Sequence, residues 1–358
     1  MKIAVIGAGN GGQAISGYLA LQGYEVSLCD IVETKVKILQ QLKGITLTGY
    51  YKGLGELECV TMDVSEAVRG AEIVMITTVA NAHRAVAQSM APYIEDGQII
   101  ILNPGRTCGA LVFKQMLNEC GCNKRYYLGE AQTLVYACRV VSDGTVNVIG
   151  VKDEVFMSGL PSSDTDYILE KIGPIYPCFK KVPNVLYTSL ENIGAMFHPC
   201  VCLFNAATIE RKDEFWFYRD MTDQVAHFIE KFDLERIAVG KAYGIDLIDV
   251  NEWIKVAYKE TSGNTLCERL RNNPAYHDIK APGTIFTRQL TEDIPTGVIP
   301  IMELGKAAGV DVPLLESMIN IIESLLEQDL HSNGRTLRNL GLTGKTKDEI
   351  IDFITNGK

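Results

Sequence analysis

The sequence has no apolar run of the roughly 20 residues that a membrane-spanning helix needs. Its short apolar start, Met1 to Ile6, leads into glycines instead of a small-residue cleavage site, so we expect neither a membrane span nor a secretion signal. No block of lysine and arginine offsets the formal net charge of -10, and a nucleic-acid backbone would be repelled. We therefore expect no membrane and no nucleic acid as a partner.

The ten cysteines lack the spacing of a zinc site or of a disulfide framework. Cys120 and Cys122, like Cys200 and Cys202, are separated by one residue instead of two, and no histidine cluster lies near them. The others are scattered through apolar segments. We expect no metal site, small core thiols and a reducing, cytoplasmic location.

The chain does have the composition of a folded protein of about two domains, with 358 residues, of which 47% are hydrophobic and 22% charged. Its first half alternates β-branched runs with amphipathic segments, which predicts right-handed βαβ units on a parallel sheet. The predicted strands cover residues 3–6, 25–30, 72–77, 98–102 and 125–128, and the clearest helices cover 13–21 and 82–93. Residues 44–62 interrupt this pattern and are predicted to form an inserted hairpin.

After about Val185 the pattern changes to apolar residues at i, i+3 and i+4, which predicts a helical second domain. The predicted helices cover residues 189–209, 220–243, 250–259, 297–308 and 313–328, with a short terminal helix near 350–354. The predicted fold class is thus α/β, with a doubly wound Rossmann domain at 1–184 and an all-helical domain at 185–358. Pro183 and Asn184 mark the change of pattern.

A glycine motif follows the first predicted strand and precedes a helix, the context in which G-x-G-x-x-G binds a dinucleotide. Gly7 permits the tight turn, Gly9 lets the backbone approach a pyrophosphate, and Gly12 lets the helix pack against the strand. The full candidate set is Gly7, Gly9, Asn10, Gly11 and Gly12. The alternative is a glycine-rich turn of some other βαβ protein.

Asp30 ends the next predicted strand, where a carboxylate accepts hydrogen bonds from the adenosine ribose. That charge would repel a 2′-phosphate, and no arginine follows at position 31 or 32 to attract one. We therefore expect NAD as cofactor in preference to NADP. In the alternative interpretation Asp30 is only a strand-end residue.

Two more loops follow predicted strands at the edge of the sheet where ligands bind in open α/β folds. Residues 77–80, with Thr78 and Ala80, and residues 103–107 are expected to frame the nicotinamide half of the cofactor. Arg106 offers a guanidinium that could fork to a substrate carboxylate. Alternatively, Thr78 caps the following helix and the Pro-Gly pair is an ordinary turn.

His198 lies on the face of helix 189–209 that carries small and polar residues, beside the predicted apolar stripe of Leu190, Ile193, Phe197, Val201 and Phe204. Pro199 removes a helix N–H, so we expect the helix to kink or restart at His198 and to direct the imidazole into a cleft. A hydrogen-bonded structural histidine is the alternative.

Asp293 precedes a predicted helix, where its ordinary role is an N-terminal cap. Beside His198 it would instead fix the imidazole tautomer and raise its basicity, and hydride transfer to C=O or C=N needs such a proton donor. Arg288, taken alone, reads as a surface arginine. His83 begins a helix beside the 77–80 loop and is a possible residue at the edge of the site.

Several segments together resemble the opine dehydrogenase family, that of octopine and nopaline dehydrogenases. They are residues 136–139, 184–192, 197–199, 273–276, 287–288, 292–295 and 334–337. The resemblance extends from the glycine motif to the tail, and it is strongest to the bacterial N-(1-D-carboxyethyl)-L-norvaline dehydrogenase type.

The resemblance implies a helical domain of the 6-phosphogluconate-dehydrogenase C-terminal type and NAD(P)H-dependent reduction of an imine. The imine would form between a 2-oxo acid, such as pyruvate, and the amino group of an L-amino acid. His198 would be the general acid/base and Asp293 its orienting carboxylate, while Arg288 would contact the cofactor pyrophosphate or a substrate carboxylate. Substrate contacts implied in the same way are Arg106, Cys138 and Asn192, although some members carry a neutral polar residue at the position of Arg106.

Two other functions compete with this one. A simple 2-oxo-acid, hydroxy-acid or glycerol-3-phosphate dehydrogenase also joins a Rossmann to a helical domain, but these enzymes commonly use a catalytic lysine, which the face around His198 lacks. A non-catalytic NAD-binding sensor would have no need for His198 and Asp293. We also expect a homodimer through the helical domain.

Overall fold

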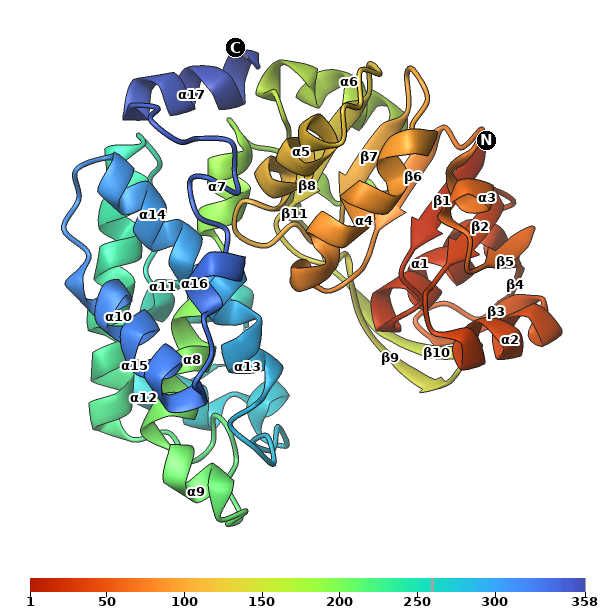
Figure 1. Ribbon diagram of the computed structural model, residues 1–358. Helices are drawn as coiled ribbons and strands as arrows, with labels where there is room; N and C mark the ends of the chain where they lie inside the picture. The colour runs from red at the N-terminus through yellow and green to blue at the C-terminus, as the bar shows by residue number, and fades with distance from the viewer. Residues whose placement is uncertain (259–260, 358) are drawn as a thin grey trace. The chain divides into compact units, whose positions relative to one another are not determined.

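The computed structural model describes residues 1–258 and 261–357 of the chain (Figure 1). It divides into two compact units. The first holds Met1–Ser189 and the described part of Asp352–Lys358, and the second holds Leu190–Ile351. Lys259, at the end of the predicted helix 250–259, and Lys358, at the end of the predicted second domain, lie outside the described residues.

The first unit is built on an eight-stranded sheet with the order β12-β11-β8-β7-β6-β1-β2-β5. All its pairings are parallel except that of β11 with β8. The strands are β1 (Lys2–Ile6), β2 (Glu25–Cys29), β5 (Cys59–Thr61), β6 (Ile73–Ile76), β7 (Ile99–Leu102), β8 (Tyr127–Ala131), β11 (Val155–Gly159) and β12 (Phe179–Lys181). The predicted Rossmann sheet is therefore confirmed. The five predicted strands include the four central strands of the sheet, which are β8, β7, β6 and β1.

A second sheet, with the order β4-β3-β10-β9, packs on the first helix of this unit. Its strands are β3 (Gly44–Gly49), β4 (Gly53–Glu56), β9 (Tyr136–Ser142) and β10 (Thr145–Val151). The hairpin β3–β4 confirms part of the prediction for 44–62, but β5 leaves it and pairs with β2 in the main sheet. The hairpin was predicted too long because residues 59–61 pair with β2, a distant partner that the local pattern does not reveal.

The helices that accompany the sheets of the first unit along the chain are labelled in Figure 1. They are α1 (Asn10–Leu21), α2 (Glu33–Leu42), α3 (Val64–Val68), α4 (His83–Met90), α5 (Gly109–Glu119), α6 (Thr165–Ile172) and α7 (Val185–Leu190). The tail helix α17 (Lys347–Asn356) returns to this unit, where the Lys114 ammonium lies 5.9 Å from the centre of the Phe353 ring.

The described part of the second unit is helical, as predicted. Its helices are α8 (Gly194–Phe204), α9 (Ala206–Glu210), α10 (Asp223–Ala242), α11 (Val250–Ala257), α12 (Leu266–Asn272), α13 (Arg288–Thr291), α14 (Ile299–Ala307), α15 (Pro313–Leu326) and α16 (Leu330–Asn333). A five-residue π-helix, Ile294–Val298, leads into α14. Within the described residues no helix has both the length and the apolar character to cross a membrane.

The predicted helix 189–209 is wrong as a single element, because the chain forms α7, α8 and α9 there. The carbonyl of Leu190, at the end of α7, accepts a hydrogen bond of 2.9 Å from Arg236 Nη1. Arg236 is fully buried and pairs with buried Asp233, whose Oδ1 lies 2.6 Å from Arg236 Nε. The last carbonyls of a helix have no partner within the helix, and the buried guanidinium supplies one for Leu190. This contact helps α7 to end at Leu190.

Of the kink or restart predicted at His198, the restart is not seen, since α8 is one continuous helix through Pro199. Pro199 is the sixth residue of α8 and has no N–H to donate to the Ala195 carbonyl. Because this is one hydrogen bond near the start of the helix, the helix tolerates its loss. The predicted apolar stripe holds except at Phe204, which is exposed.

Candidate active site

The glycine motif forms the turn between β1 and α1, and the structure explains two of its glycines sterically. Gly7 adopts φ +103°, which favours glycine, and a Cβ on Gly12 would lie 1.7 Å from the Gly7 carbonyl oxygen. A Cβ on Gly9 would meet no atom within 4 Å. Gly9 therefore faces open space at the carboxyl edge of the sheet, where a ligand phosphate can approach the backbone.

Asp30 holds this turn in place from the end of β2. Its Oδ2 accepts a hydrogen bond of 2.6 Å from the Ala8 backbone N–H, and its Oδ1 accepts one of 2.9 Å from Val32. Lys35 Nζ lies 3.6 Å from Oδ2. A carboxylate has about four acceptor positions, so Asp30 can still accept from a ribose hydroxyl. Nothing in the local sequence marks the Lys35 contact, because only the fold turns α2 back toward Asp30.

Buried polar atoms lie at the ends of the neighbouring strands. Thr78 Oγ1 and both amide atoms of Asn103 have no hydrogen-bond partner among the described residues. Thr78 does not cap the turn that begins at buried Ala80, so its alternative role as a cap is not seen. Unsatisfied buried polar groups cost about 1–3 kcal/mol each, and a ligand with its own donors and acceptors would remove that cost.

These features fit a nicotinamide dinucleotide. The open face of Gly9 suits the pyrophosphate, Asp30 suits the adenosine ribose, and Thr78 and Asn103 offer polar groups to the nicotinamide half. All four lie at the carboxyl ends of neighbouring strands of one sheet.

Strand β9 lies beside the glycine turn. Asn10 Oδ1 accepts a hydrogen bond of 2.8 Å from Val140, and the Cys138 thiol lies 3.4 Å from the Asn10 carbonyl oxygen. Burial raises the pKa of the Cys138 thiol to about 11, which keeps it neutral. A Cβ on Gly11 would lie 2.9 Å from Leu134 Cδ1, so the segment before β9 packs on the turn as well.

The loop after β7 carries Arg106, half-buried and at φ +59°, and Cys108 at φ +61°. Non-glycine residues adopt such angles only when their surroundings hold them. Gly105 N–H donates to the Ala131 carbonyl at 3.0 Å, and Cys108 N–H donates to Ser189 Oγ at 2.8 Å. The structure therefore fixes the backbone on either side of Arg106.

Glu130, which no sequence motif marks, anchors this loop from the end of β8. It is fully buried, and its Oε2 accepts from Ala110 N–H at 2.7 Å. Its Oε1 accepts from the hydroxyls of Thr188 and Ser189 at 2.6 and 2.8 Å. The sequence hint of this role was a carboxylate two residues after the strand predicted at 125–128.

In the helical unit, the structure brings His198 and Asp293 together from segments 95 residues apart. His198 Nδ1 lies 2.6 Å from Asp293 Oδ2, and the side chains are 26% and 7% exposed. Asp293 makes no capping hydrogen bond to the π-helix that follows. The contact depends on close packing, because a Cβ on Gly297 would lie 2.6 Å from Ala195 Cβ in α8.

Two further groups border the His198–Asp293 pair. The Phe217 ring meets the imidazole edge-on, with 5.9 Å between ring centres. Cys202 lies one turn along α8, and its burial, together with the nearby charge of Asp293, raises the pKa of its thiol to about 12. The Phe217 ring is apolar and the Cys202 thiol stays neutral, so neither group places a charge beside the pair.

Arg288 and Asn192 also lie in the helical unit. Arg288 begins α13, is mostly exposed and pairs with buried Glu292, with 2.9 Å from Nε to Oε2. Asn192 is buried between α7 and α8, and its Nδ2 would lie 3.4 Å from a Cβ on Gly297. His83 is fully buried at the start of α4. Of the predicted set, the helical unit thus contains His198, Asp293, Asn192 and Arg288, and the sheet unit contains the others.

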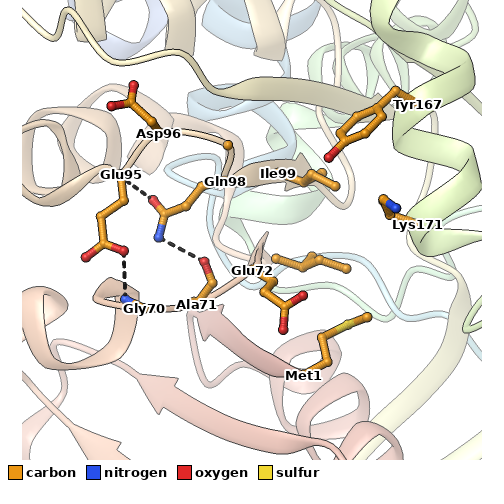
Figure 2. Close-up of a pocket in the computed structure, with 12 residues that line it drawn as sticks. Met1, Gly70, Ala71, Glu72, Glu95, Asp96, Gln98, Ile99, Tyr167 and Lys171 are labelled. Carbon is orange, nitrogen blue, oxygen red and sulfur yellow. Dashed lines mark hydrogen bonds between the residues drawn. The ribbon is translucent and has the colours of Figure 1, made fainter.

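A surface pocket of about 250 Å³ lies at the amino ends of β1, β6 and β7 (Figure 2). Gln98 spans its wall, where its amide donates to the Ala71 carbonyl at 2.9 Å and accepts from Glu95 N–H at 2.9 Å. Because ligands of open α/β sheets bind at the carboxyl ends of the strands, this pocket is not the dinucleotide site.

Comparison with known proteins relates both units to dehydrogenases. Residues 181–326 match the family described as NAD/NADP octopine/nopaline dehydrogenase, alpha-helical domain. Residues 2–105 match the N-terminus of NAD-dependent glycerol-3-phosphate dehydrogenase. An opine dehydrogenase from Arthrobacter sp. (strain 1C) is 39% identical over 345 residues, which cover 96% of each chain.

Two solved structures have the same fold. Octopine dehydrogenase with NADH and L-arginine has a TM-score of 0.84 at 23% identity, and with NADH and pyruvate it has 0.82 at 22%. Each comparison covers 100% of this chain and 98% of the other.

Proposed function

This chain belongs to the opine dehydrogenase family and is an NAD-dependent oxidoreductase, and we propose that it reductively joins the amino group of an L-amino acid to a 2-oxo acid. The observation that carries the proposal is the His198–Asp293 pair at 2.6 Å in a chain that also has a complete dinucleotide turn. The octopine dehydrogenase structures with NADH, L-arginine and pyruvate support this class of substrates.

His198 is the proposed general acid/base, acting through Nε2 because Asp293 holds Nδ1. When the amine adds to the carbonyl of the oxo acid, Nε2 donates a proton to the departing water, and a protonated imine remains. Bound NADH supplies the hydride that reduces the C=N carbon to a secondary amine. The overall reaction consumes one proton and releases one water. Asp293 keeps the imidazole oriented and stabilises its charged form.

The other proposed roles follow the chemistry of each residue. Arg288 is proposed to contact the cofactor pyrophosphate. For the substrate, Arg106 is proposed to contact a carboxylate, and Cys138 and Asn192 to line the site as neutral groups. The proposed cofactor contacts in the sheet unit are Gly7, Gly9, Asn10, Gly11, Gly12, Asp30, Thr78 and Ala80.

The domain limits proposed for this function are 1–184 for the dinucleotide-binding domain and 185–358 for the helical substrate and catalytic domain. The residue ranges of the two family matches support this division. A cytoplasmic location is part of the proposal, supported by ten cysteines that are all free thiols. A homodimer through the helical unit is supported by exposed apolar side chains at Leu234, Ile321 and Leu325, and light scattering of the purified protein tests it.

The test is oxidation of NADH by the purified chain over a grid of 2-oxo acids, with and without L-amino acids. The proposal expects turnover only when both substrates are present. Turnover with an oxo acid alone would instead identify a hydroxy-acid dehydrogenase. NADH binding without any turnover would point to an amine substrate outside the panel or to a sensor.

A further inference from the structure

Lys152 lies at the carboxyl edge of the main sheet, in the short loop that joins β10 to β11. Because β11 runs antiparallel to β8, its first residues lie beside the carboxyl end of β8. The loop is fixed there by two backbone hydrogen bonds, from Lys152 to the Val135 carbonyl at 3.0 Å and from Gln132 to the Phe156 carbonyl at 2.9 Å. Lys152 therefore lies at the edge of the sheet that carries the dinucleotide turn.

The loop that carries Arg106 reaches the same short segment from the neighbouring strand. Gly105, the residue before Arg106, donates to the carbonyl of Ala131, and Lys152 Nζ donates to Thr133 Oγ1 at 2.6 Å. The guanidinium loop and the lysine ammonium thus both contact the segment 131–133. The two cations come from different elements, the loop after β7 and the loop after β10.

The surroundings of Lys152 oppose its positive charge. The residue is exposed, and desolvation of its ammonium group together with the charge of Arg106 lowers the pKa of Lys152 to about 8. Of the nearby carboxylates, Asp153 and Glu154 on the same loop are exposed, and Glu130 at the end of β8 is bonded to Ala110, Thr188 and Ser189. Two cations held together in this way are stabilised by an anion bound between them.

We propose that Lys152 and Arg106 form one binding site for a carboxylate, and that the carboxylate is that of the 2-oxo acid. This inference rests on the proposed function for the identity of its ligand. The Thr133 hydroxyl, already bonded to Lys152, adds a polar group to the site. Since cofactor phosphates offer the same anionic chemistry, the experiment must separate the two sources.

The experiment compares the wild type with Lys152→Gln, Lys152→Arg and Lys180→Gln, an exposed control in the same unit. Steady-state kinetics with pyruvate as the oxo acid give KM and kcat, and NADH fluorescence gives the Kd of the cofactor. We expect Lys152→Gln to raise the KM for pyruvate about 10- to 100-fold, since it removes one charged partner of the anion. The Kd for NADH should stay within about twofold, Lys152→Arg should recover most of the affinity, and the control should match the wild type.

The pH dependence gives a second readout that needs no neutral variant. The binding form of Lys152 is the charged one, and its charge is lost as the pH rises through about 8. Relative to Lys152→Arg, whose guanidinium stays charged, the wild-type kcat/KM for pyruvate should fall above that pH. Taking this ratio at each pH cancels the ionisation of the amino-acid substrate. If Lys152→Gln does not fold, this comparison decides the question.

An unchanged KM for pyruvate in Lys152→Gln would overturn the proposal, and so would a loss confined to NADH binding, which would assign the pair to the cofactor. Calorimetric titration of pyruvate into the NADH-loaded protein separates this inference from the proposed function. If Lys152→Gln loses pyruvate binding, the carboxylate site is supported even when the wild type shows no turnover. If the wild type turns over and Lys152→Gln binds pyruvate as well as the wild type does, the carboxylate site is refuted and the proposed function stands.

Discussion

Replacing Asp293 with asparagine tests the link between the structure and the chemistry. The change keeps the size of the side chain but removes the charge that lies 2.6 Å from His198 Nδ1. A hydrogen bond to a charged group is worth about 1.5–3 kcal/mol. At about 1.4 kcal/mol for each tenfold change in rate, its loss in the transition state lowers kcat roughly 10- to 150-fold. His198→Gln, which removes the general acid/base itself, should cost about 10²- to 10⁴-fold.

The assay is steady-state NADH oxidation together with the Kd for NADH from fluorescence. Neither variant should weaken NADH binding much, since neither residue is among the proposed cofactor contacts. The chain offers a matched control in the same unit, the exposed pair His277–Asp278, with 3.1 Å between Nδ1 and Oδ1. Asp278→Asn should leave kcat unchanged. Near-normal kcat in Asp293→Asn, or an equal loss in the control, would refute the reasoning.

Four further substitutions, with Arg211→Met as a control, test the fold and the cofactor site. Gly9→Ala should leave the midpoint of thermal unfolding unchanged and raise the Kd for NADH. Gly12→Ala should lower the midpoint itself, because its Cβ would lie 1.7 Å from the Gly7 carbonyl oxygen. Calorimetry measures the midpoint and NADH titration the Kd, and equal effects of the two substitutions would count against the assigned roles. Asp30→Asn should raise the KM for NADH and reduce the preference over NADPH, as measured with both cofactors, and an unchanged preference would leave Asp30 a purely structural role. Arg236→Met leaves the buried Asp233 carboxylate without its cation and should lower the free energy of unfolding in urea by about 3–5 kcal/mol. Arg211→Met, in an exposed ion pair, should lower it by at most about 1 kcal/mol. Similar losses in the two variants would show that burial of the pair does not matter here.

The sequence predicted the features that depend on local pattern. The apolar runs of β1, β2, β6 and β7 have to be buried on both faces, so they stand out without any knowledge of the fold. The glycine motif was visible because the steric demand at Gly12 arises within the same strand-turn-helix unit. Asp30 follows from its place at the end of β2.

Features that depend on distant pairing could not be predicted. Nothing local indicates that β3 pairs with β10, or that Arg236 reaches the carbonyl of Leu190 and helps end α7. In the sequence, Lys152 and Glu130 look like ordinary charged residues. Only the antiparallel pairing of β11 with β8 brings Lys152 to the edge of the sheet, and only the fold brings the loop after β7 to Glu130. His198 and Asp293 lie between these cases, because the residue types suggested a pair and only the packing of Gly297 on α8 explains their contact.

The most direct test of reductive condensation is the mass of the product formed with deuterated NADH. Pyruvate and an L-amino acid should give one secondary amine that contains both carbon skeletons, has lost one water and carries one deuterium from the cofactor. Deuterated lactate in place of that amine, formed equally well without the amino acid, would contradict the account.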